Sequence, residues 1–295
     1  MIEAILERVC YIPYRCRGWS RQQRLGRGKS RSRGSGLEFD RIRNYEPGEG
    51  IRRINWSATA RQGDHSLLVN TYYEDKAQTI MLVVDLSASM DFGTKRLTKK
   101  ALAAELSASL VYSALRSSDR IGFLGFTTEV VCYLPPGQGR HYQWLIPSAI
   151  LQYDSTQART DYWPMAATLQ QYLKQRTLIF LISDFLTANI EQLMQTTEVL
   201  HDRHDLINVT ISDPRETTLP VGVGRMVTRD LETGKIATYS FSRRNRRRMA
   251  LAAQARQDQL QALWQRLNIA HVTVTPESNY PEELTQMFLM CRGRM

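Results

Sequence analysis

The chain has 295 residues, of which 42% are hydrophobic, and it carries a formal net charge of +10 at pH 7. This length and composition allow one large hydrophobic core with appendages or two smaller cores, and they exclude a disordered or fibrous protein. The four cysteines lack the paired spacing of metal ligands, so we expect reduced thiols in an intracellular protein. No stretch resembles a signal peptide or reaches the length of a membrane span. We therefore expect a globular, cytoplasmic protein without a transmembrane segment.

The positive charge is concentrated in two clusters of basic residues. Residues 15–33 contain eight Lys and Arg residues and no acid, and residues 243–248 contain five Arg residues. Such clusters attract nucleic acid, anionic lipid or an acidic protein, and they also occur as solvated arms without a ligand. Because residues 15–36 are rich in Arg, Gly and Ser, we expect a basic, partly flexible amino-terminal arm over residues 1–35.

Two segments before the main domain are expected to be ordered. Residues 1–12 have apolar side chains on one side of a short helix, which would pack onto the domain. Residues 36–75 combine apolar residues with a turn at Pro47 and Gly48, and residues 66–74 alternate as a strand does. We expect residues 36–75 to form an ordered segment of their own.

Residues 76–295 alternate between apolar, β-rich runs and segments with helical periodicity. Strands are expected at residues 80–85, 120–126, 129–134, 177–184, 206–212 and 269–275. Helices are expected at residues 96–117, 142–151, 165–174, 188–202, 243–267 and 281–291. The Pro- and Gly-rich residues 135–139 should break the chain, and residues 219–241 should form a small β-hairpin insertion. The alternation predicts an α/β fold with a doubly wound, mostly parallel sheet.

The first strand of this domain runs into the sequence LVVDLSASM. Asp85, Ser87 and Ser89 carry side-chain oxygens at alternate positions, and ligands of open α/β sheets bind beyond the carboxyl ends of the strands. A later strand ends in Asp184, which should face the same edge of the sheet. Carboxylate and hydroxyl oxygens are the ligands that hard cations such as Mg²⁺ prefer. The sequence therefore predicts a metal site.

Together with Thr160 in a polar loop, these residues resemble the von Willebrand factor A fold. Its metal-ion-dependent adhesion site takes an Asp-x-Ser-x-Ser loop, a Thr from a second loop and an Asp from a third. More narrowly, residues 36–61 (GLEFDRIRNYEPGEGIRRINWSATAR), followed by LVVDLSASM, SDRIGFLGF, LPPGQGR and LISDF, resemble the bacterial domain-of-unknown-function family 58. That family is linked to MoxR-type AAA+ ATPases, and the resemblance extends over nearly the whole chain after residue 35.

The resemblance implies hydroxyl ligands at Ser87 and Ser89, carboxylates at Asp85 and Asp184 that bind directly or through water, and a switchable ligand at Thr160. The ion would be Mg²⁺, Mn²⁺ or Ca²⁺. Two carboxylates and neutral hydroxyls leave a divalent ion with an open position, so an Asp or Glu of a partner protein can enter. The implied function is a non-enzymatic adaptor, without catalytic residues, that acts with a MoxR-type AAA+ ATPase.

The loop side chains allow more than one assignment. Three neighbours in the loop could replace Thr160 as a ligand: Ser155, Thr156 and Asp161. The Asp-Ser-Ser loop could instead cap the start of a helix, because these residue types accept hydrogen bonds from free backbone amides. His201 and His204 have a spacing that can bind metal, but an exposed helix end is the expectation there.

Two other functions remain as alternatives to an adaptor. A phosphotransferase or phosphatase of the haloacid dehalogenase type would use Asp85 as a nucleophile and an acid two residues later as general acid, where this chain has Ser87. A nucleic-acid binder would depend on the two arginine clusters alone. RNA-binding signatures and interleaved aromatic residues do not accompany them.

Overall fold

The chain divides into two compact units. The computed structural model describes residues 2–14, 38–47, 50–62, 66–73, 77–94, 97–156, 158–186, 189–217, 225–229, 236–240 and 242–292. One unit comprises residues 25–77, and the other comprises residues 1–24 together with residues 78–295. The basic cluster of residues 15–33 lies outside the described residues, so its flexibility stays a prediction.

The unit of residues 25–77 contains a small sheet of its own. Its elements are β1 (Glu38–Asn44), η1 (Ile51–Arg53), α3 (Trp56–Gln62) and β2 (Leu68–Tyr73). β1 and β2 pair antiparallel, and neither strand joins the main sheet. The side chain of Asn55 donates to Asn70 Oδ1 (2.8 Å) and accepts from the backbone N–H of Ala58 (2.9 Å), so it fastens α3 to β2. Domain boundaries at residues 35 and 75 stay predictions.

A six-stranded sheet organises the second unit. Its strands are β3 (Thr79–Asp85), β4 (Arg120–Phe126), β5 (Val130–Gly137), β6 (Leu178–Ser183), β7 (Asp205–Ile211) and β10 (Ala270–Val274). They lie in the order β10-β7-β6-β3-β4-β5, and all neighbours are parallel except β4 and β5. The sheet is therefore mostly parallel, as predicted.

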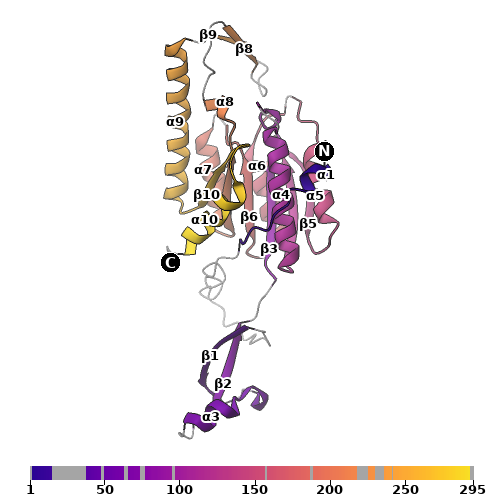
Figure 1. Cartoon of the computed structure of the whole chain (residues 1–295), viewed down its shortest axis with the longest axis vertical. Coiled ribbons are helices and arrows are strands. Elements are labelled where there is room, and N and C mark those ends of the chain that lie inside the picture. Colours follow the sequence, from indigo (N-terminus) through magenta and orange to yellow (C-terminus); the bar gives the residue numbers. More distant parts are fainter. Residues whose placement is uncertain are drawn as a thin grey trace. The chain divides into compact units, whose positions relative to one another are not determined.

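Helices cover both faces of this sheet (Figure 1). One face carries α1 (Ile2–Leu6), α4 (Lys99–Arg116), α5 (Tyr142–Gln152) and α10 (Tyr280–Arg292). The opposite face carries α6 (Tyr162–Tyr172), α7 (Ile190–His201) and α9 (Arg243–Arg266). The doubly wound α/β fold predicted from the sequence is thus confirmed. Within the described ranges, no helix combines the length and the apolar character that a bilayer crossing demands.

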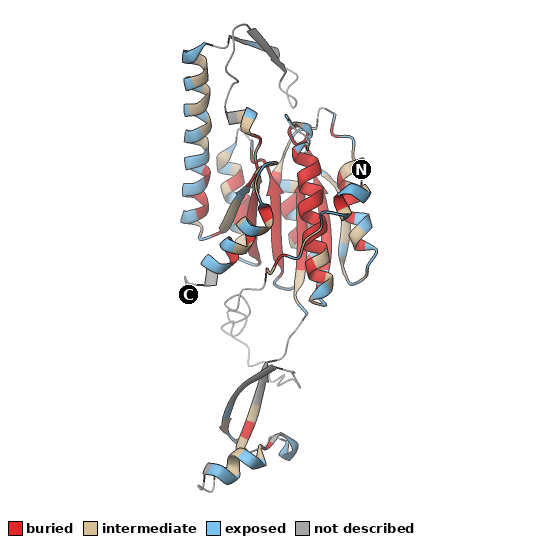
Figure 2. Ribbon diagram, viewed as in Figure 1, coloured by how far each residue is buried: buried red, intermediate tan, exposed pale blue. Residues whose placement is uncertain are grey.

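The central strand β3 contributes to two hydrophobic cores because successive side chains of a strand point to opposite faces. Ile80, Leu82 and Val84 pack with α4 and α10, whereas Met81 and Val83 pack with α6, α7 and α9. All five side chains are buried, as expected for a parallel strand that is covered on both faces. Figure 2 shows that burial is concentrated in the central strands and in α4.

The amino-terminal segment packs onto the main domain, as the sequence predicts, although its helix α1 covers Ile2–Leu6 and not the whole of residues 1–12. Ile12 is buried, and its backbone N–H donates to Ser113 Oγ (2.8 Å). The hydroxyl group of the buried Tyr14 donates to Asp119, whose other carboxylate oxygen accepts the backbone N–H of Gln78 (2.7 Å). These contacts fix the segment to the start of the main sheet.

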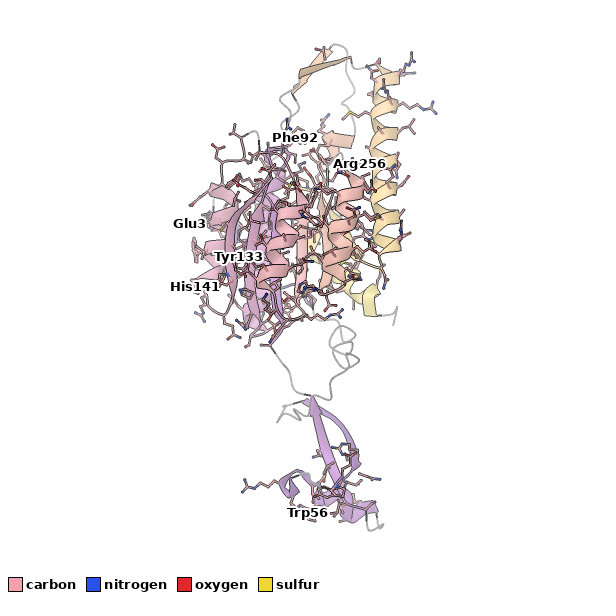
Figure 3. All side chains as sticks on the ribbon, turned by 180° about the vertical axis from the view of Figure 1, so that it is seen from behind. Glu3, Trp56, Phe92, Tyr133, His141 and Arg256 are labelled. Carbon is pink, nitrogen blue, oxygen red and sulfur yellow. The ribbon has the colours of Figure 1, made fainter. Side chains whose placement is uncertain are left out.

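The expected hairpin is also present, because β8 (Arg225–Arg229) pairs antiparallel with β9 (Ile236–Ser240). The second arginine cluster occupies the first turns of α9, where Arg243, Arg244, Arg247 and Arg248 are exposed. Further along this helix lies Arg256, which is labelled in Figure 3. Its guanidinium group donates to the backbone carbonyl of Phe185. A role of the cluster in binding an anionic partner stays a prediction.

β5 differs from its prediction. The strand continues through Pro135 and Pro136 to Gly137, where the sequence predicted a break. Proline cannot donate a hydrogen bond to a neighbouring strand, and sheets therefore tolerate it on edge strands. β5 is an edge strand. The position of a strand within its sheet, which the local pattern does not reveal, explains this error.

Two polar side chains near β7 are buried without a hydrogen-bond partner among the described residues. His204 is 2% exposed and Asn208 is 0% exposed. Both ring nitrogens of His204 and both polar side-chain atoms of Asn208 lack a hydrogen-bond partner among the described residues. The expectation of an exposed helix end is therefore wrong for His204. Burial lowers the pKa of His204, and the positive charge of Arg203 lowers it further.

We expect His204→Phe to remove part of the pH dependence of stability. Because folding holds the pKa of His204 below its ordinary value of about 6.5, the unfolded chain binds more protons as the pH falls through that value. The wild-type protein therefore loses stability toward acid pH. Urea unfolding at about pH 7.5 and about pH 5 should show a larger loss of unfolding free energy in the wild type than in His204→Phe.

Substitution of the exposed His141 by Phe provides the control, because folding does not bury this side chain, and the loss of unfolding free energy between the two pH values should stay as in the wild type. Equal losses of stability in wild type and His204→Phe would contradict the assignment of this pH dependence to His204.

Candidate metal centre

The predicted ligands lie at the carboxyl ends of β3 and β6, which are neighbours in the sheet. The chain places β4 on one side of β3 and later places β6 on its other side, so the strand order changes direction between β3 and β6. Open α/β sheets bind ligands at such switch points. Asp85 is the last residue of β3, and Asp184 directly follows Ser183, the last residue of β6. The topology therefore brings both acids to one edge of the sheet.

Asp85 is completely buried. Its Oδ1 accepts the backbone N–H of Ser87 (2.9 Å), and its Oδ2 accepts the hydroxyl of Ser183 (2.7 Å). No salt bridge reaches Asp85 in the part of the chain that the structure describes. Burial, followed by repulsion from Asp184, raises the pKa of Asp85 to about 7. A buried carboxylate with neutral donors lacks a counter-charge, and a bound cation would supply one.

Three hydroxyl groups accompany this carboxylate. The Oγ atoms of Ser87 and Ser89 are 2.9 Å apart. Thr160 Oγ1 lies 3.5 Å from Oδ1 and 3.4 Å from Oδ2 of Asp85. Four of the five predicted ligands, which come from two separate loops, are therefore gathered beside each other.

The alternative ligands in the loop before α6 have other partners. The hydroxyls of Ser155 and Thr156 donate to carboxylates outside the predicted site. Asp161 caps the amino terminus of α6 by accepting the backbone N–H of Trp163 (2.9 Å). Of the four candidate ligands in this loop, Thr160 is thus the one that faces Asp85.

Helix capping does not account for Ser87. This residue precedes the 3-10 helix η2 (Ala88–Asp91), but its side chain makes no capping hydrogen bond. The backbone N–H of Ala88 donates to the carbonyl of Ala158 (2.9 Å), which joins the loop after β3 to the loop before α6. The Ser87 hydroxyl therefore does not cap η2, and it bonds to the Ser89 hydroxyl (2.9 Å).

Asp184 has a partner that the sequence did not reveal. Its Oδ1 accepts the backbone N–H of Leu186 (3.0 Å), and its Oδ2 accepts from the ammonium group of Lys99 (2.6 Å). Lys99 is the first residue of α4 and is fully buried. Its ammonium also donates to Glu216 Oε1 (2.6 Å) in α8 (Pro214–Thr217). Lysines at the start of a helix are normally solvated, so no sequence pattern marks this one.

Electrostatic attraction keeps Lys99 charged in this buried position. Burial alone would lower the pKa of Lys99, but the negative charges of Asp184 and Glu216 outweigh that effect and raise it overall. Burial raises the pKa of Glu216, and the charge of Lys99 acts in the opposite direction. The three groups form an ion cluster next to the candidate metal centre.

A second acid holds α8 in place. Asp213 follows β7 and accepts the hydroxyl of Thr94 (2.7 Å) and the backbone N–H of Arg215 (2.8 Å). Burial would raise the pKa of Asp213, but these hydrogen bonds lower it overall. The loop that contains Thr94, between η2 and α4, is thereby attached to the end of β7.

The residues present fit a hard divalent cation. Their donors are a buried carboxylate without a salt bridge and three hydroxyl groups, all of them oxygen ligands. Among the described residues, no group of three or more His, Cys, Asp or Glu side chains could hold a metal. Any cation at this site would therefore depend on the Ser and Thr hydroxyls as well as on Asp85.

Comparison with known proteins identifies the family. The model of the family described as "Protein of unknown function DUF58" matches residues 41–261. The chain belongs to the DUF58 family. Uncharacterized protein Rv1480 of Mycobacterium tuberculosis (strain ATCC 25618 / H37Rv) is 30% identical to this DUF58 protein over 224 residues, which cover 75% of this chain and 69% of the relative. The family resemblance seen in the sequence motifs is confirmed.

Solved structures similar to this DUF58 protein include domains of the von Willebrand factor A type. BatB from Bacteroides thetaiotaomicron is 13% identical with a TM-score of 0.46, over 74% of this chain and 100% of that chain. A von Willebrand factor type A protein from Catenulispora acidiphila is 11% identical with a TM-score of 0.38, over 76% of this chain and 43% of that chain. These likenesses concern the fold alone.

We expect Ser183→Ala to destabilise the domain by about 1–3 kcal/mol, because it leaves one oxygen of the buried Asp85 without its donor. The substitution also removes the acceptor of the Phe185 backbone N–H (2.9 Å). Urea unfolding in the presence of a chelator measures the loss. Ser148→Ala is the control: the Ser148 hydroxyl donates to the Trp144 carbonyl within α5, and its loss should cost less than about 0.5 kcal/mol. Equal effects of both variants would contradict a supporting role of Ser183.

Proposed function

We propose that this DUF58 protein is a non-enzymatic adaptor that binds a divalent cation and uses it to dock an acidic residue of a partner protein. The observation that supports this most strongly is the environment of Asp85. Its carboxylate is fully buried, is bonded to neutral donors and lies beside the hydroxyls of Ser87 and Thr160. A cation would remove the free-energy cost of that uncompensated charge.

The cation would be held by Asp85, Ser87, Ser89 and Thr160, with Asp184 as a further ligand that acts directly or through water. Mg²⁺, Mn²⁺ and Ca²⁺ all prefer such oxygen donors. When bound, the ion would supply a positive charge with an open coordination position at the edge of the sheet. Neutral hydroxyls do not cancel its charge, so a carboxylate from another molecule gains both coordination and charge pairing.

Exposed apolar side chains near the site favour a protein as the source of this carboxylate. Leu186, two residues after Asp184, is 41% exposed, and Trp163, three residues after Thr160, is 53% exposed. Aromatic and aliphatic side chains are typical anchors of protein interfaces. By the family resemblance, the partner would be a MoxR-type AAA+ ATPase in the cytoplasm.

Catalysis is not part of this proposal. A phosphotransferase of the haloacid dehalogenase type needs an acid two residues after its nucleophile, and this position holds Ser87. A serine hydroxyl does not donate a proton at neutral pH as a carboxylic acid does. Hydrolysis of a generic phosphate monoester in Mg²⁺ by the wild type, abolished in Asp85→Asn, would favour the enzyme instead.

Cation binding is tested with Asp85→Asn, which keeps the size of the side chain and removes its charge. At a Mg²⁺ concentration about 100 times the dissociation constant, the wild type should gain about 2.7 kcal/mol in unfolding free energy. Asp85→Asn should gain nothing, because its coordinating carboxylate is lost. Isothermal titration calorimetry and urea unfolding measure the two effects.

Asp202→Asn is the control for this experiment, since Asp202 is exposed at the end of α7 and should leave cation binding unchanged. A wild type that shows no Mg²⁺, Mn²⁺ or Ca²⁺ binding, or an Asp85→Asn variant that binds as the wild type does, would refute the metal centre.

Partner capture should depend on the same site. Tagged wild-type protein should retain a MoxR-type ATPase in Mg²⁺, and a chelator or Asp85→Asn should abolish this retention, because the bridging charge is lost. Quantitative mass spectrometry of proteins from an affinity purification measures it. Retention that is unchanged by the chelator would refute cation-dependent docking, and retention that is lost only with rising salt would favour the arginine clusters.

A further inference from the structure

The ammonium group of Lys99 is a positive charge that the protein itself places beside the candidate metal centre. It lies 2.6 Å from Asp184 Oδ2, and the Lys99 side chain is completely buried. Asp184 directly follows Ser183, whose hydroxyl donates to Asp85 Oδ2 (2.7 Å), so Asp184 lies at the same edge of the sheet as Asp85. A cation bound at Asp85 would therefore approach Lys99 with a charge of the same sign.

Lys99 has a second acidic partner that does not belong to the predicted ligand set. Glu216 Oε1 lies 2.6 Å from the Lys99 ammonium, the same distance as Asp184 Oδ2. The carboxylate of Glu216 is partly exposed, whereas that of Asp184 is nearly buried. Lys99 is thus shared between one carboxylate that faces the candidate site and one that lies in α8.

We infer that Lys99 acts as an internal competitor of the cation: it neutralises Asp184, weakens cation binding at Asp85, and is held by Glu216 when a cation binds. This inference rests on the proposed function and adds a residue that sets the affinity of its site. A unit charge a few ångströms away changes the binding of a divalent ion strongly, because the surroundings are buried and weakly screened.

The arrangement also connects the site to α8. If Lys99 moves from Asp184 toward Glu216, the ion pair with α8 becomes stronger as the cation binds. The hydrogen bonds of Asp213 to Thr94 and to Arg215 tie the same region to the loop before α4. Cation binding and the attachment of α8 therefore favour each other through Lys99.

The experiment measures Mn²⁺ binding to the full chain by electron paramagnetic resonance of the free ion. Lys99→Met should bind Mn²⁺ about tenfold more tightly than the wild type, because a repelling charge is lost and Asp184 becomes free. Glu216→Gln should bind Mn²⁺ about tenfold more weakly, since Lys99 then remains with Asp184 and a nearby negative charge is lost. General damage to the site would weaken binding in both variants, so the opposite directions distinguish competition from misfolding.

Arg176→Gln is the control for the total charge of the chain. It removes one positive charge, but Arg176 pairs with Asp205 (2.6 Å) at the first residue of β7, at the opposite end of the strand from Asp213. Its Mn²⁺ affinity should change less than about twofold, because the distance is long and the group is partly exposed. The double variant Lys99→Met/Glu216→Gln removes both partners of one ion pair. It takes the place of Lys99→Met in the test if the single variant does not fold.

The outcomes separate the two proposals. Three results support the competitor: Mn²⁺ binding by the wild type, weaker binding by Glu216→Gln, and tighter binding when Lys99 is replaced, in Lys99→Met relative to the wild type or in the double variant relative to Glu216→Gln. Binding that is not tightened in folded Lys99→Met relative to the wild type, or in the double variant relative to Glu216→Gln, overturns the role of Lys99 and leaves the metal centre intact. Absence of Mn²⁺ binding in the wild type and in every variant overturns both.

Discussion

The parallel pairing of β3 with β6 is the constraint on which the candidate metal centre depends. Register places Val84 beside Ile182, and the next residues are Asp85 and Ser183, whose side chains form a hydrogen bond of 2.7 Å. A shift of either strand by one residue would turn its side chains toward the opposite face. The apolar residues of both strands set the register, and the register in turn fixes the position of the Asp85 carboxylate.

Charge balance at the start of α4 is the second determinant of this region. The amino terminus of a helix carries a partial positive charge and disfavours cations, yet α4 begins with the buried lysines Lys99 and Lys100. Lys99 is compensated by Asp184 and Glu216, and Lys100 Nζ lies 3.2 Å from Asp91 and 3.1 Å from Ser155 Oγ. Each lysine thereby holds a loop from another part of the chain against the same helix end.

The residue pattern alone predicted the fold, and it also pointed to four of the five candidate ligands: Asp85, Ser87, Ser89 and Asp184. Long apolar runs that end in acids identify central parallel strands, and the topology rule then assigns Asp85 and Asp184 to one edge. Spacing alone identified Ser87 and Ser89, whereas Thr160 was taken from the family resemblance. Whether these residues bind a cation stays a prediction, since hydrogen-bond geometry describes the donors and not their ligand.

Other features depend on tertiary contacts that local patterns do not encode. Lys99 resembles any solvated lysine in the sequence, and its role follows only from the acids that two distant loops bring to it. His204 was expected at an exposed helix end because HDRH is polar, but the packing around β7 buries it. The strand predicted at residues 129–134 is present, but its continuation through Pro135 and Pro136 was missed because the rule against proline applies to interior strands.

Those two prolines also affect how the sheet meets other molecules. An edge strand offers unpaired backbone amides that can recruit a strand from a neighbouring chain, and proline has no amide hydrogen to offer. β5 is the outermost strand on its side of the sheet and contains Pro135 and Pro136. Another strand cannot pair regularly with β5 over these two residues. The same two prolines that concealed the last residues of β5 from the sequence analysis therefore protect this edge of the sheet against aggregation.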